Sequence, residues 1–187
     1  MSISIKIMQI LSKLRVSAGW VFFILIALIG KVQNFWPWPL LLIIGGESIR
    51  TIAAGTIKKN EILATSGIYG NVRHPLYFGS SLISLGFCLM CNNIFLWTYF
   101  FIFFPLCYGP AIFLEETYLE SRFGERFQKY RQTVPAFMPF RIRKMDLKNN
   151  LSLRLIFENR EHHNWLILLI TVLVLVLKIK FMDISFR

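Results

Sequence analysis

The fold of this chain turns on one polar, turn-rich stretch between two long apolar runs, Gly67-Ile68-Tyr69-Gly70-Asn71-Val72-Arg73-His74-Pro75-Leu76-Tyr77. His74 precedes a proline, which disfavours a helical backbone at that residue. Pro75 suits the first position of a new helix, because the missing N–H would have no intrahelical partner there. The free N–H groups of that first turn, with Arg73 and His74 beside them, are suited to an anionic group. A basic loop in front of a membrane helix is the plainer alternative.

The composition is typical of an integral membrane protein. Of the 187 residues 55% are hydrophobic, and the mean hydropathy is +0.54. Several apolar runs reach or approach the roughly 20 residues that cross a bilayer. The net charge of +11 does not indicate nucleic acid binding, because the basic residues lie between the apolar runs. There they set the topology and meet anionic lipid headgroups.

We predict an all-α integral membrane fold with about five membrane helices and a cytoplasmic helical segment towards the C-terminus. Pro105 and Pro110 are expected to kink the fourth membrane helix, and Gly124 is expected to end it. Residues 1–145 are predicted to form the membrane domain, and residues 146–187 a basic linker and a C-terminal apolar helix. The expected elements are an amphipathic lead-in over 1–15, spans over 16–31, 40–55, 75–91 and from Ile94, a short helix over 126–132, and a fifth span over 162–177.

The distribution of charge predicts the topology. With the N-terminus inside, 17 of the 21 lysines and arginines lie on the cytoplasmic side, and the other four are Lys31, Lys178, Lys180 and Arg187. This is a strong positive-inside bias. It puts the 56–74 loop and the 115–160 segment on one face, so that Arg73-His74 can meet Glu115-Glu116.

Charged residues also occur inside the second predicted span. Glu47 and Arg50 lie three apart and therefore share one helical face. They either border a polar cavity or pair with each other near the cytoplasmic end. No metal site is predicted, because the pair Cys88 and Cys91 has no matching second pair and His162-His163 has only Glu161 nearby.

Two motifs meet on the predicted cytoplasmic face. They are Gly67-x-Tyr69-x-x-x-Arg73-His74-Pro75-x-Tyr77-x-Gly79 and Glu115-Glu116-x-x-Leu119-x-x-x-Phe123-Gly124-x-x-Phe127-x-x-Tyr130. Together they resemble the isoprenylcysteine carboxyl methyltransferase family and the related phospholipid methyltransferases, over about residues 45–140. At position 127 this chain has Phe where that family commonly has Tyr, a mild departure.

The resemblance implies a membrane methyltransferase that uses S-adenosylmethionine, in a bacterial cytoplasmic membrane with its active site on the cytoplasmic face. The implied partners are membrane lipids and a lipidic or small apolar methyl acceptor. His74, Glu116 and Arg131 are the implied catalytic residues, with Arg131 as an arginine clamp for a carboxylate and Arg122 or Arg50 as other candidates. The implied cofactor-binding residues are Tyr69, Arg73, His74, Pro75, Tyr77, Gly79, Glu115 and Glu116.

The sequence does not identify the methyl acceptor. A prenylcysteine-like carboxylate is the first expectation. A phospholipid amine is the nearest variant, and it would need a base such as His74 because the amine must lose a proton. A sterol-type reductase using a nicotinamide cofactor has a similar Arg-His-Pro stretch, but it has many more spans. A non-enzymatic membrane scaffold is the remaining alternative, and the intact motifs argue against it.

Overall fold

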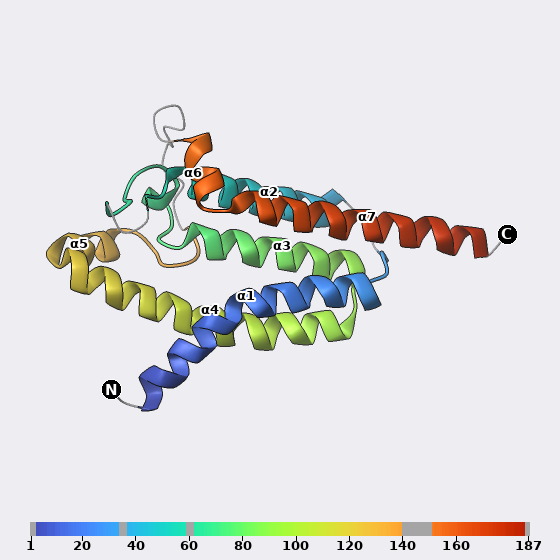
Figure 1. The fold of residues 1–187 in the computed structure, drawn as a ribbon, viewed down its shortest axis with the longest axis horizontal. Helices are drawn as coiled ribbons and strands as arrows, with labels where there is room; N and C mark the ends of the chain where they lie inside the picture. Colours follow the sequence, from blue (N-terminus) through green and yellow to red (C-terminus); the bar gives the residue numbers. More distant parts are fainter. Residues whose placement is uncertain (1–2, 34–36, 59–61, 140–150, 186–187) are drawn as a thin grey trace.

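The computed structural model describes residues 3–33, 37–58, 62–139 and 151–185. Within these ranges the chain is helical and contains no strand, which confirms the all-α prediction. Figure 1 shows α1, α2, α3, α4 and α7 running side by side along the long axis, with α5 and α6 at one end. The elements are α1 (Ile3–Ile29), α2 (Pro37–Thr56), the 3₁₀ turn η1 (Gly67–Gly70), α3 (Pro75–Cys91), α4 (Ile94–Phe123), α5 (Glu125–Thr133), α6 (Leu153–Glu158) and α7 (Glu161–Ser185).

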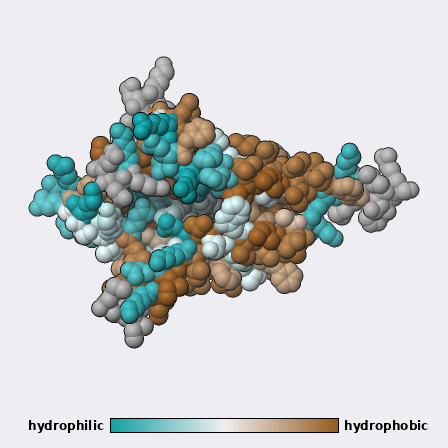
Figure 2. Space-filling model, in the orientation of Figure 1, coloured by the Kyte–Doolittle hydropathy of each residue, from teal (hydrophilic) through white to brown (hydrophobic). Residues whose placement is uncertain are grey.

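The long helices have the lengths and surfaces of membrane segments. Ile5–Ile29, Ile94–Phe123 and Glu161–Phe181 are long and apolar enough to cross a bilayer. α3 is equally apolar but has 17 residues. Figure 2 shows hydrophobic residues over the bundle and hydrophilic ones gathered at the end that holds α5 and α6. An exposed apolar surface of this extent suits lipid rather than water, so the protein is an integral membrane protein.

The central helix α3 has the boundaries that the sequence predicts. It begins at Pro75, directly after His74, whose backbone is not helical (φ −120°, ψ 63°). It ends at Cys91, because Asn92 adopts the left-handed conformation with φ of 41°. α4 continues across Pro105 and Pro110, and Figure 1 shows its two halves running in different directions.

Small residues let α2 and α3 approach closely. A Cβ atom added at Gly79 would lie 2.5 Å from the carbonyl oxygen of Gly46, and one at Gly46 would lie 2.6 Å from that of Gly79. Both obstacles are backbone atoms, which cannot rotate away. The small residues Gly46 and Gly79 therefore allow close helix packing, and Gly79 belongs to this contact.

We predict that Gly46→Ala destabilises the protein by about 1–3 kcal/mol, because its methyl group overpacks the α2–α3 contact. The neighbouring Gly45→Ala is the matched control, since a Cβ there meets nothing within 4 Å. It should leave the melting temperature unchanged or slightly higher, because alanine favours a helix by about 1 kcal/mol over glycine. Thermal unfolding of both variants in detergent measures the difference, and equal melting temperatures would contradict the close contact.

Both ends of the chain differ from expectation. α1 is one continuous helix from Ile3 to Ile29, not a lead-in over 1–15 followed by a span over 16–31, because no proline separates the two parts. The segment expected to be a basic linker contains α6, whose Ile156 is buried. The burial of Ile156 holds this short helix against α2, together with hydrogen bonds from the Ser152 N–H to the carbonyl oxygen of Gly55 at 2.9 Å and from Asn159 Nδ2 to that of Ala54 at 2.8 Å.

Helix α7 is fastened to α2 by polar contacts. The carboxylate of Glu161 accepts two hydrogen bonds from the Arg50 guanidinium, at 2.8 and 3.0 Å. Asn164 Nδ2 donates to Glu47 Oε2 at 2.7 Å, while Arg50 Nε lies 4.0 Å from Glu47. The principal partner of Arg50 is therefore Glu161, which neither sequence-based alternative considered.

The two ends of the bundle separate the basic segments as the charge pattern predicts. The start of α1, residues 62–74, α5 and α6 lie at one end, and the C-terminal end of α7 lies at the other (Figure 1). At that far end Lys178 Nζ donates to the carbonyl oxygens of Leu28 and Gly30, at 2.9 and 3.0 Å. Both motifs consequently share one end of the molecule.

Candidate functional site

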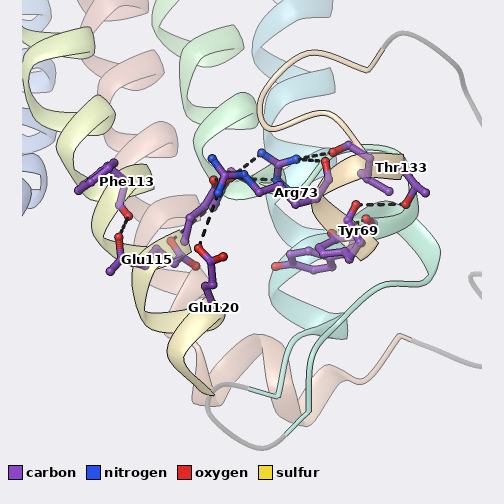
Figure 3. A network of polar contacts seen from close by, with 12 residues as sticks. Tyr69, Arg73, Phe113, Glu115, Glu120 and Thr133 are labelled. Carbon is purple, nitrogen blue, oxygen red and sulfur yellow. Dashed lines mark hydrogen bonds and ion pairs between the residues drawn. The ribbon is translucent and has the colours of Figure 1, made fainter. Parts of the chain in front are cut away.

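Arg73 joins the 57–74 loop to α4 and to the segment after α5 (Figure 3). Its Nε and Nη2 lie 2.9 and 2.7 Å from Glu116 Oε1, and its Nη1 donates to the carbonyl oxygens of Arg131 and Val134 at 2.8 and 2.6 Å. The side chains of Arg73 and Glu116 are 9% and 11% exposed. A buried charge of this kind needs such partners, so Arg73 acts as an anchor inside the protein.

Backbone contacts fix the same loop against the segment that follows α5. The N–H groups of Arg73 and His74 donate to the carbonyl oxygens of Pro135 and Ala136, at 2.9 and 3.0 Å. This extended pairing is possible because proline keeps His74 out of the helix.

Two buried tyrosines complete the attachment of the loop. Tyr130 on α5 donates its hydroxyl to the carbonyl oxygen of Tyr69, at 2.6 Å. Burial raises the pKa of Tyr69 and of Tyr130 well above the ordinary value. Both hydroxyls therefore stay protonated, and Tyr130 remains a hydrogen-bond donor.

His74 lies between the two glutamates, as the sequence predicts. Its Nε2 is 3.1 Å from Glu116 Oε1, and its Nδ1 is 3.8 Å from Glu115 Oε2. The imidazole is 4% exposed and stacks on the ring of Tyr77, with centroids 5.7 Å apart. The paired carboxylates thus meet the Arg-His-Pro stretch across the gap between α3 and α4.

Tyr77 connects Glu115 to Arg15 on α1. The Tyr77 hydroxyl donates to Glu115 Oε2 at 2.8 Å and accepts from Arg15 Nη1 at 2.9 Å. The Arg15 guanidinium also lies over the Tyr77 ring, 5.5 Å from its centroid. Sequence reasoning placed Arg15 in a surface lead-in and missed this contact, because no spacing within a motif relates residue 15 to residue 77.

A cavity of about 510 Å³ opens among these residues. Its volume is in the range of small-molecule sites. Apolar and aromatic residues form the remaining wall, among them Tyr118, Leu119, Phe123, Phe127 and Tyr130. The predicted site residues that line this first cavity are Tyr69, Arg73, His74, Pro75, Tyr77 and Glu115.

Three predicted site residues lie outside its lining. Gly79 packs against α2, and Glu116 lies behind His74, held by Arg73. The side chain of Arg131 is 52% exposed and lies 3.6 Å from Glu116 and 3.7 Å from Glu120. Arg131 lines neither this cavity nor the second cavity of the bundle. The geometry gives Glu116 a positioning role and leaves Arg131 away from the cavity.

A second cavity of about 520 Å³ lies deeper in the bundle, between α1, α3, α4 and α7. Ser80, Arg50, Glu161 and Asn164 contribute polar groups to it. Arg15, Leu76 and Tyr77 line both cavities, so they form the partition between them. Many of its lining residues are aromatic, namely Trp20, Phe22, Phe23, Tyr77, Tyr99, Phe100, Phe103, Phe104 and Tyr108.

The sequence comparisons agree with the resemblance. Residues 48–126 match the model of the phospholipid methyltransferase family. The chain is similar to protein-S-isoprenylcysteine O-methyltransferase of Schizosaccharomyces pombe, with 35% identity over 94 residues that cover 50% of this chain and 40% of the relative. It is also similar to protein-S-isoprenylcysteine O-methyltransferase B of Arabidopsis thaliana, with 32% identity over 126 residues that cover 59% of this chain and 64% of the relative.

A third relative is the cobalt-zinc-cadmium resistance protein CzcN of Cupriavidus metallidurans, with 34% identity over 112 residues that cover 56% of this chain and 51% of the relative. The chain spans about half the length of the curated relatives it matches. No solved structure matches it. The family match contains Arg73, His74, Glu115 and Glu116, and it leaves Arg15 and helices α6 and α7 outside.

Proposed function

We propose that this phospholipid methyltransferase-like chain is an S-adenosylmethionine-dependent methyltransferase of the membrane, acting on a lipidic acceptor. The observation that carries the proposal is the pair of adjoining cavities, one built from both motifs with Arg73, His74 and Glu115 in its wall, the other inside the bundle and richer in aromatic side chains. A polar cofactor and an apolar acceptor would each find a suitable environment, with their reacting ends meeting at the partition.

The first cavity suits the cofactor chemically. The Glu115 side chain is 38% exposed, lines the cavity, and has hydrogen-bonding neighbours in Tyr77 and His74. Among the described residues no lysine or arginine nitrogen forms an ion pair with Glu115, so its charge is available to a cationic ligand. S-adenosylmethionine carries an ammonium and a sulfonium, and the aromatic wall suits its adenine ring.

The cofactor would supply an electrophilic methyl carbon, to which the acceptor would bond as the carbon–sulfur bond breaks, with S-adenosylhomocysteine as the second product. The protein's part is to bind, align and exclude water. A carboxylate acceptor is already ionised and needs no general base. His74 therefore serves to hold Glu116 and to support Tyr77, rather than to remove a proton.

The acceptor we propose is the carboxylate of a prenylcysteine-like molecule, in line with the printed names of two relatives. Its chain would lie in the aromatic cavity. A phospholipid amine is the second candidate, favoured by the name of the matching family model. The positive-inside charge pattern supports an active site on the cytoplasmic face of the membrane.

Calorimetry with the purified protein in detergent tests the cofactor. We expect S-adenosylhomocysteine to bind, and we expect His74→Ala and Glu116→Ala to weaken binding because each disturbs the wall that holds Glu115. Arg154→Ala is the control, since Arg154 pairs with Glu158 on the exposed side of α6 and lines neither cavity. Binding of a nicotinamide cofactor instead of S-adenosylhomocysteine would overturn the proposal.

A methyl-transfer assay identifies the acceptor class. A prenylated cysteine, a phosphatidylethanolamine and a small thiol are offered in parallel, with a radiolabelled methyl group on the cofactor. We expect label in the prenylated cysteine. Label confined to phosphatidylethanolamine would favour the amine candidate.

A further inference from the structure

We propose that Arg15 binds the carboxylate of the methyl acceptor at the partition between the two cavities, and that it selects an anionic acceptor over an amine. The inference rests on the proposed function and deepens it. Arg15 comes from α1, outside the range that matches the family model. Arg15 therefore lies outside the two motifs on which the resemblance rests.

The position of Arg15 suits this role. With Leu76 and Tyr77 it is one of three residues that line both cavities. An acceptor whose chain lies in the aromatic cavity must present its reacting end here to reach a ligand in the first cavity. Among the arginines and lysines that the structure describes, Arg15 alone lines both cavities.

The charges around Arg15 favour an anion. The other arginine of the first cavity, Arg73, is neutralised by Glu116. The second cavity also has Arg50, which is neutralised by Glu161, and Arg160, which does not line the first cavity. Arg15 instead donates to a neutral phenol, the hydroxyl of Tyr77. Among the described residues, no carboxylate oxygen lies within ion-pair distance of its guanidinium.

Tyr77 gives the guanidinium a defined orientation. The hydrogen bond of 2.9 Å and the ring contact hold Arg15 over Tyr77, while Tyr77 itself is held by Glu115 at 2.8 Å. A guanidinium has five N–H donors in a planar fork, which matches the two oxygens of a carboxylate. The partition thus has a carboxylate on the cofactor side and a guanidinium on the acceptor side, joined through one hydroxyl.

This arrangement discriminates between acceptors by charge. A carboxylate gains an ion pair with Arg15, whereas an amine arrives as an ammonium and is repelled. Methylation turns the carboxylate into a neutral ester, which loses the charge attraction, so the same residue favours release of the product.

Direct binding, without cofactor, tests the proposal. The probes are a prenylated N-acetylcysteine and its methyl ester, and the measurement is calorimetry in detergent. We expect the wild-type protein to bind the acid at least tenfold more tightly than the ester, and Arg15→Gln to remove this difference. Arg15→Lys should keep part of it, because it retains the charge but not the planar fork. Lys13→Gln is the matched control, since Lys13 is exposed on the same helix and should behave as wild type.

Binding of S-adenosylhomocysteine separates this inference from the proposed function. We expect Arg15→Gln still to bind it, at most a few-fold more weakly because Arg15 also lines the first cavity, and this binding shows that the variant is folded. If Arg15→Gln weakens S-adenosylhomocysteine binding and keeps the acid preference, Arg15 belongs to the cofactor site and the inference is wrong. If wild type binds S-adenosylhomocysteine but does not distinguish acid from ester, the inference fails while the methyltransferase proposal stands. Failure of the wild type to bind S-adenosylhomocysteine overturns the proposed function itself. Should Arg15→Gln not fold, equal acid and ester affinities in Arg15→Lys would overturn the inference.

Discussion

Arg73→Met is expected to lower the stability of the protein by about 3–5 kcal/mol, because it leaves the buried carboxylate of Glu116 without its main partner. The same substitution removes the hydrogen bonds from Nη1 to the carbonyl oxygens of Arg131 and Val134. The segment after α5 would then lose its attachment to the loop in front of α3. We expect a melting temperature about 10 °C lower in detergent, and loss of S-adenosylhomocysteine binding.

Arg131→Met is the matched control for this prediction. Arg131 contacts the same carboxylate, but at 3.6 Å and with a side chain that is 52% exposed. Exposed ion pairs contribute about 0–1 kcal/mol, so the melting temperature should change little. Equal effects of the two substitutions would contradict the anchoring role of Arg73. Loss of methyl transfer in Arg131→Met at unchanged stability would restore Arg131 as a substrate clamp.

Glu115→Gln is expected to weaken the binding of S-adenosylhomocysteine about ten- to hundredfold. Hydrogen bonds to charged groups contribute about 1.5–3 kcal/mol, and each 1.4 kcal/mol is a factor of ten in affinity. Glutamine keeps an oxygen that can accept from Tyr77, so the fold of the partition should be retained. Calorimetry gives the affinity, and the melting temperature of the ligand-free variant confirms that it is folded.

The same substitution at Glu120 provides the comparison. Glu120 lies on α4, is 41% exposed, and accepts a hydrogen bond from Gln128 at 3.0 Å, outside both cavities. Glu120→Gln should bind S-adenosylhomocysteine as wild type does. If Glu115→Gln also binds like wild type, the first cavity does not hold the cofactor in the way proposed.

The central part of the fold follows from local sequence features. Pro75 fixes the start of α3, and Gly124 separates α4 from α5 with φ of 51°. The charge pattern predicts that both motifs share one end of the bundle. These features act over one or a few helical turns, which is why they can be recognised in a single sequence.

The candidate site can be predicted only in part from the sequence. The motif residues Tyr69, His74, Tyr77 and Glu115 do line one cavity. The sequence could not distinguish Glu115, which faces the cavity, from Glu116, which is held behind His74 by Arg73. Adjacent residues on a helix point about 100° apart, and only the neighbouring elements decide which of them meets the cavity.

The sequence by itself determined the helical membrane architecture, the ends of α3 and the meeting of the two motifs, because run length, proline, glycine and charge act locally. The tertiary structure alone decided the partners of Arg50 and Arg15. Arg50 pairs with Glu161 across 111 positions, and Arg15 meets Tyr77 across 62. Such contacts depend on which helices lie side by side, and burial makes each of them selective, since a charge removed from water needs a specific partner.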